Sequence, residues 1–167
     1  MTTIPCVGCG ALVSDIDSPS HRYLGSSPGC WAIYGEVLAR EFGNYRYVRK
    51  HQMTVDAYAV QHPGTPSPQT MQSLAVHLIS LHLMFERGLP PAETPKIMQR
   101  ATRDKGRFSW LEPPASLGEL TVLHVHAAPS PEEHLERVEA WARAAWSAWA
   151  AHHPTVRAWA ASSARRG

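Results

Sequence analysis

The sequence lacks an apolar segment long enough to cross a bilayer. Its longest apolar stretch, residues 74–85, is interrupted by His77, Ser80 and His82, whereas a membrane-spanning helix needs about 20 apolar residues. Residues 1–6 also lack the charged start and the apolar stretch of a secretory signal. We therefore expect a soluble, cytoplasmic protein that has no membrane segment.

The chain also has little excess charge of either sign. Sixteen Lys and Arg residues stand against fourteen Asp and Glu residues, which gives a formal net charge of +2. Nucleic acids and anionic membranes bind basic surfaces, so we expect neither of them as a partner. Hydrophobic residues make up 44% of the chain and charged residues only 18%, a balance that excludes intrinsic disorder and leaves room for a homo-oligomer or another buried partner surface.

What the sequence does have, after residue 30, is apolar residues at helical spacing. The pattern predicts helices over residues 31–42, 48–61, 71–85, 91–103 and 131–150, with a last turn or two from Pro154. Ser27 followed by Pro28 is typical of a helix start, and residues 119–127 fit either a helical turn or a short strand. The three tryptophans at 141, 146 and 149 are expected in the core. We therefore predict an all-α fold, a helical bundle.

Residues 1–30 differ from the rest because they are rich in Gly, Ser, Pro and Cys and show no helical or alternating period. Such a segment must be held by something other than an ordinary core, and a metal ion is the obvious candidate. We predict a metal-binding knuckle over residues 1–30 and a helical domain over residues 31–167, which together form one compact unit. Within the second part, residues 104–118 are expected to form an ordered loop that packs on the body of the protein.

Only three cysteines are present, and their spacing predicts a zinc knuckle. Cys6 and Cys9 form a C-x-x-C pair followed by glycine, and Cys30 falls in the first turn of a predicted helix, where the helix dipole favours a thiolate. With His21 as the fourth ligand, the set has the Cys3His composition of structural zinc sites. His51 and His62 compete for the fourth position, and a redox-active Cys6 and Cys9 pair is the alternative without metal.

Ten histidines in one chain of this length are many, and two of them are candidate catalytic groups. Tyr58 and His62 are four residues apart on a predicted helix and can converge on one face. Together with Asp56 and His77 they would supply a carboxylate, a phenol and two imidazoles for acid-base chemistry near neutral pH. The competing interpretation is that the histidines are core residues and helix caps.

Two functions from different classes follow from these patterns. The first is a small zinc-containing enzyme that acts on a small-molecule substrate by acid-base or metal-assisted chemistry. The alternative is a non-catalytic binding or regulatory module in which zinc ties residues 1–30 to the helices. A concave polar pocket would favour the enzyme, and a flat apolar face would favour the module.

Four motifs extend over most of the chain: CVGCGA at 6–11, HRYLGSSPGCW at 21–31, VDAYAVQHPG at 55–64 and KGRFSWLEPP at 105–114. In these motifs the sequence resembles a family of uncharacterised bacterial proteins, a domain of unknown function met largely in actinobacteria. The resemblance implies a compact single-domain bacterial protein. It implies no activity and adds no catalytic role to any residue.

Overall fold

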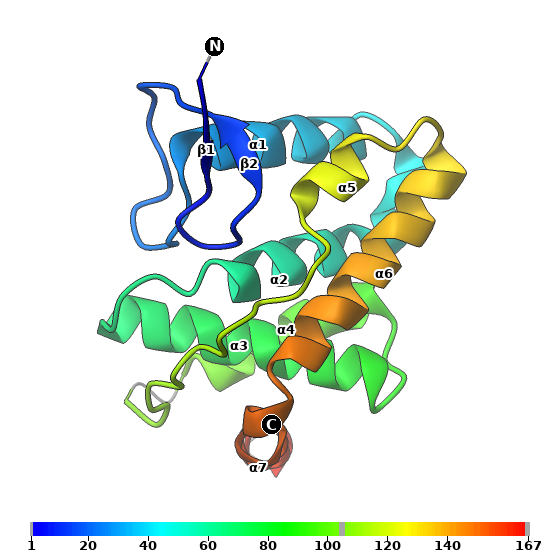
Figure 1. Cartoon of the computed structure of the whole chain (residues 1–167). Helices are drawn as coiled ribbons and strands as arrows, with labels where there is room; N and C mark the ends of the chain where they lie inside the picture. The colour runs from blue at the N-terminus through cyan, green and yellow to red at the C-terminus, as the bar shows by residue number, and fades with distance from the viewer. Residues whose placement is uncertain (1, 104–105, 166–167) are drawn as a thin grey trace.

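The computed structural model describes residues 2–103 and 106–165, and most of this part of the chain is helical (Figure 1). The predicted helical fold is thereby confirmed. In chain order the elements are β1 (Thr3–Pro5), β2 (Leu12–Ser14), α1 (Pro28–Phe42), the 3₁₀ helix η1 (Tyr45–Lys50), α2 (His51–Gln61), α3 (Pro68–Phe85), η2 (Pro91–Glu93), α4 (Thr94–Ala101), α5 (Val122–His126), α6 (Pro131–Ala148), η3 (Ala150–His152) and α7 (His153–Arg165).

The N-terminal segment contains a small antiparallel ribbon that the sequence pattern did not predict. Strands β1 and β2 pair Thr3 with Ser14, Ile4 with Val13 and Pro5 with Leu12. Each strand is only three residues long, so the alternation of buried and exposed residues is too short to recognise in the sequence. The ribbon packs against α1 through β2, beside which it lies in Figure 1.

Serine residues and prolines define the starts of the long helices, as the sequence indicates for α1 and α6. Pro28 opens α1 after Ser27, and Pro131 opens α6 after Ser130, whose side chain accepts a hydrogen bond from Glu133 N. Ser67 and Thr70 form a reciprocal capping box at the start of α3. The side chains of Ser67, Thr70 and Ser130 satisfy amides that have no partner within the helix, so they fix where α3 and α6 begin. The side chain of Ser27 makes no capping bond, so Pro28 is what marks the start of α1.

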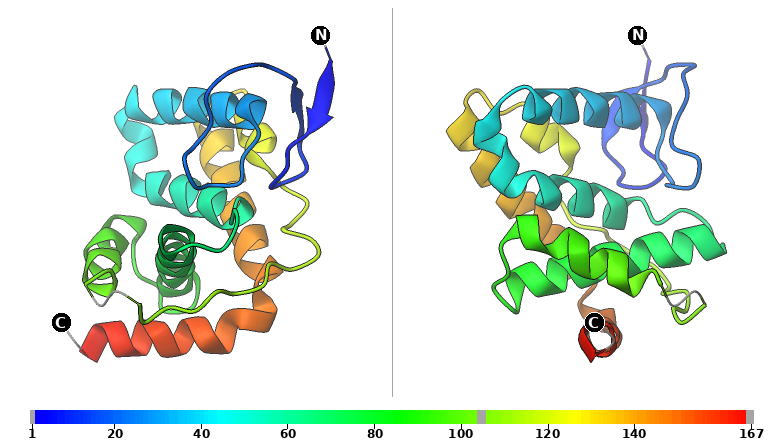
Figure 2. Two further views of the ribbon diagram at one scale, coloured as in Figure 1. Left: turned by 90° about the vertical axis from the view of Figure 1, so that its left-hand side faces the viewer. Right: turned by 180° about the vertical axis from the view of Figure 1, so that it is seen from behind.

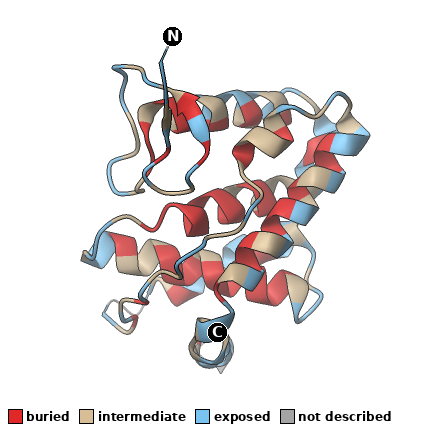
Figure 3. Cartoon of the chain, viewed as in Figure 1, coloured by how far each residue is buried: buried red, intermediate tan, exposed pale blue. Residues whose placement is uncertain are grey.

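Helix α2 lies at the centre of the molecule. Eight of its eleven residues are buried, including every residue from Asp56 to Gln61, and it packs against both α3 and α6. Figure 3 shows this concentration of buried residues in α2 and on the inward faces of its neighbours. Trp141 and Trp149 help to fix its position, since their indole N–H groups donate to Gln61 Oε1 at 2.8 Å and to Val60 O at 3.1 Å.

The two ends of the chain lie on opposite sides of the molecule. The ribbon and α1 form one layer, and α7 lies across the other end against α3 and α4, as the two views of Figure 2 show. In the described ranges, none of the helices combines the length and the apolar character that crossing a bilayer requires.

The ambiguous segment and the aromatic loop both have clear structures. Within residues 119–127, α5 is a short helix that begins after Thr121, whose side chain accepts from Leu123 N. Residues 104–105 of the predicted 104–118 loop lie outside the described residues. Residues 106–118 form no helix or strand, and Phe108 and Leu111 among them are buried in the core. The boundary predicted between residues 30 and 31 falls inside α1, and the division into two parts stays a prediction.

Candidate metal centre

The C-x-x-C motif forms a tight turn at the end of β1. Cys6 N donates to Ala11 O at 2.8 Å, and Gly10 N donates back to Cys6 O at 2.9 Å. Gly10 has a φ of 76°, a conformation that costs a residue without Cβ little. The turn places the thiols of Cys6 and Cys9 beside each other, as the knuckle spacing predicts.

Gly8 allows this turn to contact the end of α2. A Cβ at this position would lie 2.2 Å from Gly25 O and 2.5 Å from His62 Cδ2, both far inside van der Waals contact. Any larger residue would therefore push the knuckle away from His62.

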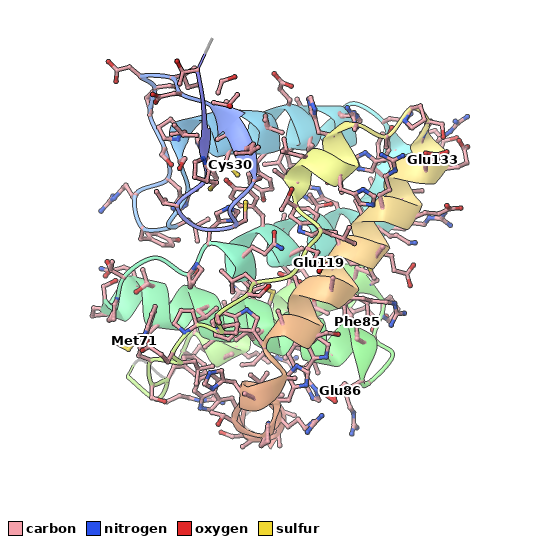
Figure 4. The ribbon with its side chains drawn as sticks, viewed as in Figure 1. Cys30, Met71, Phe85, Glu86, Glu119 and Glu133 are labelled. Carbon is pink, nitrogen blue, oxygen red and sulfur yellow. The ribbon has the colours of Figure 1, made fainter. Side chains whose placement is uncertain are left out.

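Cys30 and His62 complete a compact group with the two knuckle cysteines. One ligand atom from each of Cys6, Cys9, Cys30 and His62 lies within 4.8 Å of the other three. The sulfur atoms of Cys9 and Cys30 are 3.8 Å apart, and Cys30 Sγ is 3.5 Å from His62 Nε2. Figure 4 shows Cys30 in the first turn of α1 beside the N-terminal ribbon. This arrangement could hold a metal ion with three sulfur ligands and one nitrogen ligand.

The surrounding hydrogen bonds orient His62 for this role. His62 Nδ1 lies 2.6 Å from Tyr58 O, and because a carbonyl only accepts, Nδ1 donates to it, so Nε2 is the ring nitrogen that faces Cys30 Sγ. Ligating histidines commonly have such a partner on the second ring nitrogen. The Tyr58 ring stacks on the imidazole with centroids 4.0 Å apart, and its hydroxyl bonds to Ser26 Oγ and to Cys30 Sγ.

The proton affinities of the group reflect three sulfurs crowded in one place. Hydrogen bonds from Cys30 and Cys9 lower the pKa of the Cys6 thiol, whereas hydrogen bonds with Cys30 and Cys6 raise the pKa of the Cys9 thiol. Burial opposes protonation of His62, but its hydrogen bonds with Cys30 and Cys6 raise its pKa to about 9. The group thus stabilises a positive charge on His62 beside a thiolate. A metal cation that displaces these protons would place a larger positive charge at the same point.

His21, the predicted fourth ligand, does not belong to this group of four. Its Nδ1 accepts hydrogen bonds from Tyr23 N at 3.2 Å and from Leu24 N at 3.1 Å, and its ring packs against Trp31. His21 therefore organises the loop before α1. His51, the other competitor, lies at the start of α2 and bonds to Glu41 at 2.8 Å.

The signal for His62 was present in the sequence but open to more than one interpretation. His62 follows the last residue of α2 and precedes Pro63 and Gly64. Gly64 has a φ of 72°, and a Cβ there would lie 2.4 Å from Tyr23 O, so the chain from residue 23 crosses close to this turn. The crossing brings Cys30 and His62 together, and sequence spacing alone does not predict it.

The four residues predicted for acid-base chemistry separate into two pairs. Tyr58 and His62 converge, and both face the cysteines. Asp56 pairs with His77 across the interface of α2 and α3, with Oδ1 at 2.7 Å from Nδ1, and it also accepts from Ser80 Oγ. Asp56 is completely buried, so this second pair joins two helices.

The fold and this cluster together define a helical protein that has a candidate Cys3His metal-binding site. Residues 4–150 match a family of unknown function, DUF5946, and the chain belongs to this family. No curated protein and no solved structure is significantly similar to the chain.

Proposed function

We propose that this protein is a zinc-stabilised binding module in which Cys6, Cys9, Cys30 and His62 hold one structural Zn²⁺. The spacing of the ligand atoms carries the proposal. Tetrahedral Zn–S bonds of about 2.3 Å and Zn–N bonds of about 2.0–2.1 Å put two sulfurs about 3.8 Å apart and a sulfur and a nitrogen about 3.5 Å apart. The separations between Cys9 and Cys30 and between Cys30 and His62 are 3.8 Å and 3.5 Å.

The ligand set favours zinc over the alternatives. Iron–sulfur clusters generally take four cysteines, and the chain has three. The cysteines are free thiols, which a reducing cytoplasm, the location that we expect from the sequence, would maintain.

The closed ligand set supports a structural role over a catalytic one. Catalytic zinc keeps a coordination position for water, whereas structural zinc has four protein ligands. Cys30 and His62 are completely buried, Cys6 is 4% exposed and Cys9 is partly buried. The ion would join the knuckle, the start of α1 and the end of α2, where Tyr34 of α1 already stacks on Tyr58 of α2.

This proposal gives the predicted acid-base residues other roles. His62 would be a ligand, Tyr58 would orient it, and Asp56 and His77 would join α2 to α3. Their role in acid-base chemistry, and with it a small-molecule substrate of a zinc enzyme, stays a prediction.

Metal content tests the proposal directly. We expect native mass spectrometry of tag-free protein to find one zinc ion per chain, which both Cys30→Ser and His62→Ala should lose. His21→Ala is the matched control, because it removes an imidazole from the same region without touching the group of four, and it should keep its zinc.

Each alternative has its own outcome in this experiment. Loss of zinc in His21→Ala together with retention in His62→Ala would return the fourth position to His21. A metal-free wild-type protein that forms a reversible disulfide between Cys6 and Cys9 would replace the proposal with the redox function.

A further inference from the structure

A second candidate site lies at the opposite end of α1 and α2 from the cysteines. A pocket of about 480 Å³ is bounded by the end of α1, by η1, by the first turn of α2, by η2 and by the start of α4. At about 1.5 Å per residue along α1, Glu41 lies about 16 Å from Cys30. The pocket is therefore separate from the metal centre.

Glu41 and His51 form a hydrogen-bonded pair in the lining of this pocket. Glu41 is 3% exposed, and its Oε1 lies 2.8 Å from His51 Nδ1. Its Oε2 accepts from Thr54 Oγ1 at 2.6 Å and lies 2.7 Å from His134 Nε2. Burial alone would raise the pKa of Glu41, but these donors lower it, so the carboxylate is held ionised and fixed in place.

The protons on the two histidines can be assigned from their partners. Arg40 Nη1 lies 3.2 Å from His134 Nδ1, and since a guanidinium only donates, His134 carries its proton on Nε2 and gives it to Glu41. His51 likewise donates from Nδ1 to the carboxylate. In the hydrogen bonds of the described residues His51 uses Nδ1 alone, so its Nε2 lone pair is available to a ligand, and its side chain is 25% exposed.

The walls of the pocket are apolar and unusually open to water. Phe42, Tyr45 and Val48 are 75%, 84% and 63% exposed, and the Phe42 ring packs against His51 with centroids 4.7 Å apart. Small-molecule sites combine apolar and aromatic walls with a few fixed polar groups. Large apolar side chains that are exposed together beside a pocket indicate a surface that a ligand or partner covers during function.

The polar groups of the pocket select the kind of ligand. Besides Glu41 and His51, the lining includes the amides of Asn44 and Gln52, which bond to Arg46 N and Asp56 Oδ1. It includes no lysine or arginine, so an anionic ligand would meet the charge of Glu41 without a compensating cation. From the apolar walls and the single imidazole acceptor we infer that this pocket binds a small neutral aromatic molecule with a hydroxyl group, of the phenol or naphthol class. The rings of Phe42 and Tyr45 contact its aromatic face, and its O–H donates to His51 Nε2.

Fluorescence titration of the full-length protein with 2-naphthol tests this inference, with 2-methoxynaphthalene as the probe that keeps the ring system and lacks the O–H donor. We expect wild type to bind 2-naphthol at least tenfold more tightly than the ether. His51→Phe should remove that difference, and His126→Phe, which breaks a surface pair with Glu36, should keep it. Val48→Lys changes an exposed wall residue without disturbing the core and should weaken binding of both probes.

Several results would overturn the inference. They are a wild type that binds no 2-naphthol, equal affinity for the two probes, a His51→Phe variant that still prefers 2-naphthol, or affinities that Val48→Lys leaves unchanged. None of them depends on whether the cysteine cluster holds zinc, because both probes are neutral and the pocket lies at the other end of the two helices.

Discussion

At the scale of single residues, the candidate metal centre depends on glycine as much as on the four candidate ligands. Gly8 lies between two cysteines and faces both Gly25 O and the His62 ring. The sequence marks it only as the second residue between two cysteines, so its role follows from the three-dimensional contact. This close approach makes the position intolerant of even a methyl group.

Gly8→Ala should therefore destabilise the protein and weaken metal binding. An overpacked site costs about 1–3 kcal/mol, which thermal unfolding followed by circular dichroism measures. Gly35→Ala is the matched control, because Gly35 lies in α1 and a methyl group there would meet no neighbouring segment within 4 Å. That variant should gain about 0.5–1 kcal/mol from higher helix propensity. Equal stability of the two variants would contradict the close approach at Gly8.

At the scale of elements, α2 connects the candidate metal centre to the buried cluster around Asp56. One side of its C-terminal end presents Tyr58 and His62 to the cysteines, while Asp56 presents its carboxylate to α3. Asp56 Oδ1 accepts from both His77 Nδ1 and Gln52 Nε2, each at 2.7 Å. A helix that is buried on nearly all sides needs such paired polar groups, because a buried carboxylate without donors is costly.

Replacing Asp56 tests this structural interpretation of the predicted catalytic pair. Asp56→Asn puts an NH₂ group where a carboxylate oxygen accepts, so at least one donor from α2 or α3 loses its partner. We expect a loss of about 2–3 kcal/mol in urea unfolding, with zinc content unchanged. Asp17→Asn makes the same chemical change at an exposed position and should stay within about 0.5 kcal/mol of wild type. Loss of zinc in Asp56→Asn would show that the two clusters depend on each other.

The helical elements were largely predictable, and the centre that they build was predictable in part. The starts of α1 and α6 follow from Ser27-Pro28 and Ser130-Pro131, because a proline in the first turn and, in α6, the cap by Ser130 are local chemistry. The identity of the histidine beside the cysteines depends on where residues 23–25 cross the end of α2. That crossing is a tertiary contact, and helical periodicity carries no information about it.

At the scale of the whole molecule, the ribbon and knuckle contact the helical body at the candidate metal centre and through β2, which packs against α1. Cys6, Ala11 and Val13 are buried, while Val7 and Leu12 are 79% and 66% exposed. Such a segment buries little apolar area for its length, so the ion would supply much of the free energy that holds it in place.

Removing the metal should therefore loosen one end of the protein more than the other. Structural zinc contributes on the order of 10 kcal/mol to folding in small metal sites. With a strong chelator we expect faster amide hydrogen exchange in residues 2–27 and at the end of α2, with little change in α4 and α7. Uniform protection with and without chelator would show that the knuckle holds itself together. Readdition of Zn²⁺ serves as the control for reversibility.

The order of the ligands along the chain also has a consequence for synthesis. Cys9 and Cys30 are 21 residues apart, and Cys30 and His62 are 32 apart, so closing the site costs only moderate loop entropy. All four ligands precede α3, whereas α3 and α6 cover the helix that ends at His62. A nascent chain thus carries all four candidate ligands before the helices that bury α2 have emerged from the ribosome. If the site holds a metal, capture of the ion can precede assembly of the core.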